Sequence, residues 1–377
     1  MPNDRFSSWM TALAPAPKCQ QPSSAPAAKT AGRGGDGDAA TGCGSRRRRP
    51  LHSEVFYPRI ERAREDCKEG GGVFGTAVVC YLFLGGAGGG LCAVLAFLAS
   101  RIPFDRLGAG IAQEYRLFFA RGFGAAAALL LVGSLCLLAD SGNYPALPRL
   151  FMATRATYLS IGACSLAVAL IACAAASVFA RCAQSVSSRA CYLAGCVGLG
   201  LLGLTVALYT GLFLADMPAV AFWHSVWLPV LFLTSSLSCG LAAVLLIAWM
   251  TGTMQSFRRS LARLGGVRRV ILAIEALSLA ALVGLAAVNG GDDPLARAQQ
   301  AAGLDLVAGS LAPLFWCGAV GVGLLAPVVV EACRSRVGRA SDPGTVIAPL
   351  CVLVGAWCMR YAIVEAGVHP VISLMGA

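Results

Sequence analysis

The chain has 377 residues, of which 57% are hydrophobic and only 13% are charged. Soluble globular proteins carry about 25% charged residues, so this composition excludes that class. The 44 glycines follow no Gly-X-Y period, which excludes collagen, and the apolar fraction excludes a largely disordered chain. We therefore predict a polytopic membrane protein.

Residues 1–72 differ from the rest of the chain. They are low in complexity, poor in large apolar side chains and include the basic run Arg46–Arg49. Such a segment cannot bury enough surface to offset its ordering entropy, so we predict a disordered basic tail. It lacks the apolar stretch of a signal peptide. A downstream start at a non-Met initiator such as Val55 is an alternative, because no Met lies between Met10 and Met152.

After this tail, long apolar runs alternate with polar breaks. A span of about 30 Å of hydrocarbon needs about 20 apolar residues in a helix. The sequence therefore predicts an all-α membrane domain over residues 73–368, with residues 369–377 as a short C-terminal tail. The eight predicted spans are about 73–99, 122–139, 156–180, 190–214, 225–250, 270–288, 306–330 and 345–368.

Arginines are distributed unevenly between the two sets of loops. The loops after spans one, three, five and seven carry 14 of them, and the loops after spans two, four and six carry 3. The positive-inside rule places the first set in the cytoplasm and both termini outside. The basic excess thus indicates membrane topology and no nucleic-acid partner.

The cysteines and histidines limit the redox centres that this protein could hold. No C-x-x-C pair occurs among the 16 cysteines, so we expect no metal or iron–sulfur cluster in it. Only His52, His224 and His369 are present, whereas a bundle with two haems needs four histidines within its spans. We therefore expect no haem, and any electron transfer would use a diffusible carrier or a partner subunit.

Several polar residues fall near the predicted outer ends of the spans. Intramembrane polar groups are costly, so each is a functional candidate, with interfacial anchoring as the alternative. Together they predict a polar pocket just below the outer surface, formed by Asp140, Tyr209, Asp216, His224, Arg360 and Glu365.

Glu275 is an exception, because it lies about a turn into the sixth predicted span from the cytoplasmic side. A buried carboxylate can relay protons, which makes Glu275 a candidate for proton transfer. The alternative is a carboxylate that reaches the interface or pairs with Arg268 or Arg269.

The run Gly85–Gly90 superficially matches a dinucleotide-binding fingerprint. It lies inside a span, however, and not between a strand and a helix. We therefore expect these glycines to serve close helix packing.

Four segments, taken in order, resemble the NrfD/PsrC family of membrane subunits. The resemblance covers roughly residues 73–368, and the segments are YLFLGGAGGGLCAVLAFL, ADSGNYPALPRLF, YTGLFLADMPAVAFWHSVWLPVLFLTSSLSCGLAA and MRYAIVEAG. It implies a haem-free, eight-helix anchor of a multisubunit oxidoreductase in anaerobic respiration, located in the inner membrane of a bacterium. Such a subunit exchanges electrons between a membrane quinone and an iron–sulfur subunit, which serves a molybdopterin catalytic subunit. The quinone is menaquinone or another quinone.

The resemblance also assigns residues. It puts the family's quinone contacts at Asp140 and Tyr209, its last-helix arginine-tyrosine pair at Arg360 and Tyr361, and its helix-six glutamate at Glu275. The family's polar contact on helix one has no match, because residues 78–80 are Val, Val and Cys.

We interpret the protein as the quinone-interacting anchor of such a complex, itself outside the catalytic core. Tyr209 and Asp140 are the first candidates to hold or deprotonate a transiently bound quinol, and His224 and Arg360 are second candidates. Glu275 belongs to a proton route only if the complex conserves energy. A secondary transporter and a passive anchor without a quinone site remain alternatives, and the terminal substrate would be chosen by another subunit.

Overall fold

The computed structural model describes residues 76–102, 108–141, 158–182, 188–217, 220–254, 258–288, 294–337 and 344–375. Within these residues eight helices are long and apolar enough to cross a membrane, which confirms the predicted all-α membrane class. The predicted tail over residues 1–72 lies outside the described residues. The described elements are α3 (Thr76–Ser100), α4 (Ala109–Ser141), α6 (Tyr158–Cys182), α7 (Arg189–Ala215), the 3-10 turn η3 (Ala221–Trp223), α8 (Trp227–Met250), α9 (Arg258–Val288), α10 (Pro294–Ala308), the π-helix η4 (Leu314–Leu325), α11 (Ala326–Val337) and α12 (Gly344–Met375).

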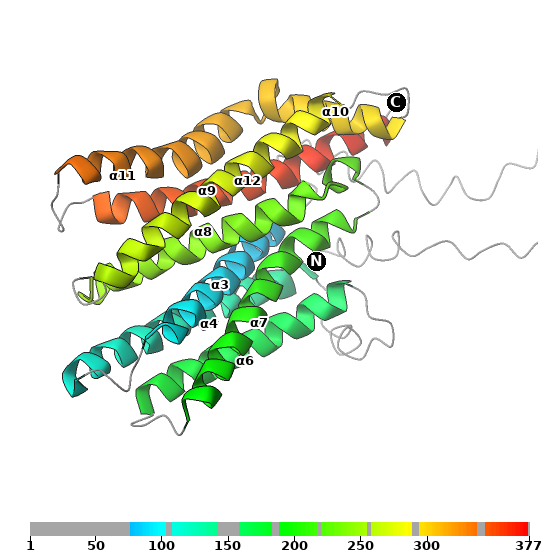
Figure 1. Ribbon diagram of the computed structural model, residues 1–377. Coiled ribbons are helices and arrows are strands. Elements are labelled where there is room, and N and C mark those ends of the chain that lie inside the picture. The colour runs from blue at the N-terminus through cyan, green and yellow to red at the C-terminus, as the bar shows by residue number, and fades with distance from the viewer. Residues whose placement is uncertain are drawn as a thin grey trace, which may run out of the picture.

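The helices form two groups that lie side by side (Figure 1). The first group is a ring in which α3 packs on α4 and α7, and α6 closes the ring against both of these. The second group contains α8, α9, α10, η4–α11 and α12. The two groups meet where α3 and α7 pack on α8. We call the end of the bundle at which α9 begins and α11 ends the arginine-rich end, and the opposite end, which holds η3, the η3 end.

Helix α3 is the most enclosed of the eight spans. In its most apolar stretch 83% of residues are buried, against 22% in α6, α7 and the η4–α11 span. A helix surrounded on all sides has no lipid-facing stripe, so its side chains must suit several neighbouring helices at once. In α3 this need is met by the run Gly85–Gly90, which is completely buried.

The glycines of α3 let neighbouring backbones approach closely. A Cβ added at Gly90 would lie 1.9 Å from the carbonyl oxygen of Ser236 in α8, and one at Gly240 would lie 2.4 Å from the Gly90 carbonyl. On another side of α3, a Cβ at Gly89 would lie 2.8 Å from the carbonyl oxygen of Gly203 in α7. Small residues at these positions bring helices together in membranes, as the sequence predicted.

The helices differ from the predicted spans mainly in length. Helices α4 and α9 begin at Ala109 and Arg258, about three turns before the spans predicted for them, because arginine-containing turns continue each helix beyond its apolar stretch. Helix α10 lies mostly in the connection between the predicted spans 270–288 and 306–330. Helix α12 continues to Met375, into the predicted C-terminal tail.

We predict that Gly90→Ala destabilises the bundle, because the added methyl group would force α3 and α8 apart. Overpacking of this kind costs about 1–3 kcal/mol. The measurement is the thermal unfolding midpoint of the purified protein in lipid nanodiscs. Gly198→Ala is the matched control, since a Cβ at this exposed glycine of α7 meets nothing within 4 Å. Equal midpoints for the two variants would contradict the packing role of Gly90.

Candidate functional site

Arg360 lies in the middle of α12 and is completely buried, with 0% of its surface exposed. Its Nη1 and Nη2 atoms donate hydrogen bonds to the hydroxyl oxygens of Ser235 and Ser236 in α8, each at 3.0 Å. The guanidinium also lies over the rings of Phe232 and Phe83, with its carbon 5.2 and 5.9 Å from the ring centres. Hydrogen bonds and aromatic faces thus replace part of the hydration that a buried cation loses, while its Nε atom has no partner among the described residues.

Glu275 of α9 provides the opposite charge to Arg360. It is 7% exposed, and its Oε2 accepts a hydrogen bond of 2.7 Å from the Ser238 hydroxyl. Its carboxyl group also interacts with the Ser235 hydroxyl and electrostatically with Arg360. Ser235 therefore links the cation and the carboxylate. A nearby opposite charge lowers the cost of holding each of them in the interior of the membrane.

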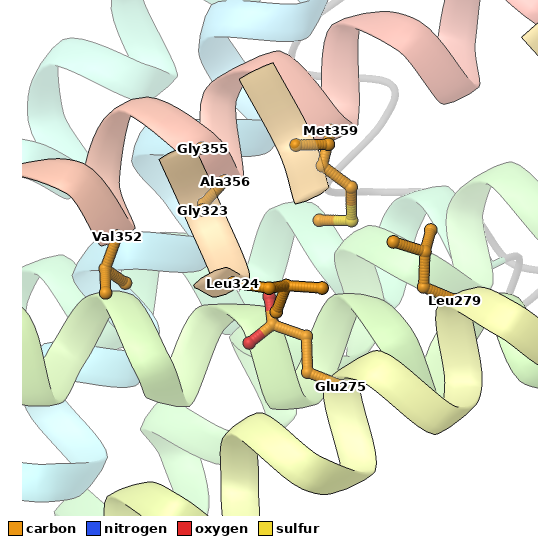
Figure 2. Close-up of a pocket in the computed structure, with 9 residues that line it drawn as sticks. Glu275, Leu279, Gly323, Leu324, Val352, Gly355, Ala356 and Met359 are labelled. Carbon is orange, nitrogen blue, oxygen red and sulfur yellow. The ribbon is translucent and has the colours of Figure 1, made fainter. Parts of the chain in front are cut away.

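A small cavity adjoins Glu275 on the side away from α8. It measures about 10 Å³, which is roughly the room that one water molecule needs. Figure 2 shows the Glu275 side chain extending from α9 toward Leu324, with Val352 and Met359 of α12 around the same space. The carboxylate thus lies between the serines of α8 on one side and a space of water size on the other.

Tyr209 of α7 lies in the first helix group, near the η3 end. It is 5% exposed, and its hydroxyl group makes a side-chain hydrogen bond with that of Tyr81 in α3. Its ring lies so close to α6 that a Cβ at Gly162 would be 1.9 Å from it, and the ring of Phe213 lies 6.0 Å away. The arrangement presents two phenol groups in an apolar surrounding, where they could hydrogen-bond to a carbonyl oxygen of a ligand.

Two of the other residues predicted for the outer pocket lie at the surface. His224 follows η3 and is exposed, as is Asp216 at the end of α7. Asp140 is the penultimate residue of α4, but its side chain lies outside the described residues. The quinone-binding roles given to His224 and Asp140 remain predictions.

Arg360 and Glu275 lie deeper than the sequence suggested. Because the apolar part of α9 begins at Leu264, Glu275 is 11 residues from its start, roughly 17 Å along the axis, and not one turn inside it. Because α12 continues to Met375, Arg360 is at mid-helix and not in the last turns. The structure therefore groups Arg360 with Glu275 and apart from Tyr209.

Arg268 does not pair with Glu275, as one interpretation of the sequence allowed. It forms an ion pair with Glu331 of α11, nearer the arginine-rich end. Arg269, the next residue, is exposed. The carboxyl group of Glu275 instead interacts electrostatically with Arg360 of α12, which the distance along the sequence could not reveal.

Sequence reasoning missed Tyr81 and the serines of α8. Tyr81 follows directly after residues 78–80, where a polar contact of helix one was sought, and is 1% exposed. Ser235, Ser236 and Ser238 are each at most 2% exposed. The signal for the serines was present in the sequence, because three hydroxyl groups within four residues are unusual in an apolar span.

Within the described residues, no group of three or more His, Cys, Asp and Glu side chains is arranged to hold a metal ion. Two groups of described polar side chains in the interior are the Tyr81–Tyr209 pair and the cluster around Arg360 and Glu275. A bundle of eight membrane helices with buried hydroxyl and charged groups belongs to the class of polytopic membrane proteins with a polar interior.

Comparison with known proteins identifies the family within this class. The family described as "Polysulphide reductase, NrfD" matches residues 67–371. Since this match covers most of the sequence, the chain belongs to the NrfD family, whose members are membrane subunits that anchor redox complexes.

Two curated relatives agree with this family. The C subunit of polysulfide reductase from Wolinella succinogenes is 31% identical over 168 residues, which are 44% of this protein and 51% of the relative. Protein NrfD of Escherichia coli strain K12 is 34% identical over 172 residues, which are 44% of this protein and 50% of the relative. The matches thus span about half the length of each relative.

We predict that Arg360→Lys destabilises the protein, although the charge is kept. A single ammonium group cannot reproduce the planar fork that donates to both Ser235 and Ser236, and each lost charge-assisted hydrogen bond costs about 1.5–3 kcal/mol. The measurement is the unfolding midpoint in nanodiscs. Arg101→Lys, at an exposed arginine beyond the end of α3, is the control. An Arg360→Lys midpoint equal to that of the control would show that the fork is unimportant.

Proposed function

We propose that this protein is the quinone-interacting membrane subunit of an oxidoreductase complex. It passes electrons between the membrane quinone pool and an iron–sulfur partner subunit, which serves a molybdopterin catalytic subunit. The observation that carries the proposal is the buried, hydrogen-bonded pair of Tyr81 and Tyr209 near the η3 end, in a family of redox-complex anchors. The partner would dock at this end, which the arginine distribution makes the outer one.

The two phenol groups fit a quinone by their chemistry. Oxidation of a quinol releases two electrons and two protons, so its site needs hydrogen bonds to the ring oxygens and a path for protons. Tyr209 and Tyr81 can orient a carbonyl or hydroxyl oxygen, and the apolar rings around them exclude water. Asp140, at the end of α4, is the candidate proton acceptor, and His224 is a second candidate.

The cluster around Glu275 supports a separate role in proton transfer. Glu275 lies at mid-span between the Ser238 hydroxyl and a cavity of water size. Its carboxyl group can therefore exchange a proton with this hydroxyl group or with a water molecule in the cavity. Arg360, which the sequence also suggested for the quinone, would hold the carboxylate in place through Ser235. This role would make the complex energy-conserving.

We expect Tyr209→Phe to lower quinol-linked turnover about tenfold, the equivalent of one lost hydrogen bond of about 1.4 kcal/mol. The assay is quinol oxidation by the complex copurified with this subunit, with an artificial electron acceptor. Tyr192→Phe is the matched control, because Tyr192 is also on α7 but donates its hydrogen bond to the Ala99 carbonyl near the other end.

Full turnover of an assembled Tyr209→Phe complex would contradict the assignment of a quinone site to Tyr209. It would favour a passive anchor if a quinone analogue also failed to bind. Copurification of an iron–sulfur protein excludes the transporter alternative.

We expect Glu275→Gln to separate electron transfer from proton movement. In proteoliposomes the variant complex would keep quinol oxidation close to the unmodified rate, while the pH change in the lumen would disappear, because an amide cannot release a proton. Glu114→Gln, at an exposed position near the start of α4, is the control. An unchanged proton signal in Glu275→Gln would contradict the relay.

A further inference from the structure

Three polar residues lie two helical turns from the cavity beside Glu275, all toward the arginine-rich end. Each is seven residues from a side chain that lines the cavity, and in an α-helix seven residues return to the same face after roughly 10 Å. Arg268 lies seven residues before Glu275 on α9. Glu331 lies seven residues after Leu324 on η4–α11, and Thr345 lies seven residues before Val352 on α12. Three helices that enclose one cavity therefore share a polar tier at the same depth.

This tier connects the surface with the interior. The side chain of Glu331 is 36% exposed, whereas that of its ion-pair partner Arg268 is only 9% exposed. The Nε atom of Arg268 and the hydroxyl group of Thr345 are buried and have no hydrogen-bond partner among the described residues. Buried polar atoms without partners are costly, so such positions attract water when space opens beside them.

Apolar side chains separate the tier from the cavity. Leu272 on α9 and Ala348 on α12 are 6% and 2% exposed, and they fill the two turns between. The polar tier and the carboxylate of Glu275 are thus aligned on these helices, with buried apolar side chains between them.

We propose that Arg268, Glu331 and Thr345 form the entrance through which water reaches Glu275, and that the Arg268–Glu331 ion pair holds this entrance closed. The guanidinium of Arg268 joins α9 to α11 across the mouth of the path. When the pair separates, Glu331 turns to the solvent, and the unpartnered groups of Arg268 and Thr345 take up water. The proton-relay role of Glu275 rests on the proposed function, whereas the water path does not.

The test is chemical labelling of Glu275 in nanodiscs, followed by mass spectrometry of the peptide that contains it. A water-soluble carbodiimide can reach this carboxyl group only through a hydrated path. We expect Arg268→Gln to increase the labelling rate at Glu275 about tenfold, which corresponds to lowering the cost of opening by about 1.4 kcal/mol. Arg269→Gln, at the exposed neighbouring position, is the matched control and should leave the rate unchanged.

Two further variants distinguish an entrance from a purely structural ion pair. Arg268→Lys keeps the pair and should label like the unmodified protein, while Thr345→Val in the Arg268→Gln background should lower the rate again. A lipid-soluble carbodiimide should label Glu275 equally in all variants, which verifies that they are folded. The inference is wrong if the lipid-soluble reagent labels Glu275 equally in all variants while the water-soluble reagent labels Arg268→Gln and Glu331→Gln as slowly as the unmodified protein. This readout needs no electron transfer, so it remains valid if the proposed function fails.

Discussion

The backbones of α3 and α8 are in direct contact, and this contact determines how the neighbouring side chains are placed. At Gly90 and Gly240 the two helices approach so closely that neither position has room for a Cβ atom. This approach fixes the depth of Ser236 relative to α3 and leaves beside Gly86 the space that Arg360 occupies, since a Cβ at Gly86 would lie 3.1 Å from its Nη2 atom. Helix packing thus determines where a charge can be held.

The interior contains two polar sites with different chemistry. In the first helix group, Tyr81 and Tyr209 offer neutral hydroxyl groups near one end of the bundle. At the junction with the second group, Arg360 and Glu275 form a charged cluster at mid-span, linked by Ser235. Neutral donors suit an uncharged ring, whereas a paired carboxylate suits proton exchange. We therefore assign the proposed quinone contacts and the proposed proton relay to separate helix groups.

The sequence was sufficient to predict the eight spans and the helix-packing role of Gly85–Gly90, because both depend on local composition. It could not predict which side chains meet across the bundle. Arg360 and Ser235 are 125 residues apart, and their contact depends on how α8 and α12 rotate and shift against each other. Glu275 lies deeper than predicted because the apolar segment of α9 begins at Leu264, before the predicted start at residue 270.

The central claim is that the close packing around α3 positions the charged cluster. A double-mutant cycle between Gly86→Ala and Arg360→Met tests it directly, with unfolding free energies measured in nanodiscs. If the added methyl group acts on the arginine and its serines, the two changes will couple, by about 0.5–3 kcal/mol for residues in contact. Additive effects would mean that Gly86 serves helix packing alone, and would contradict the claim that this packing sets the site.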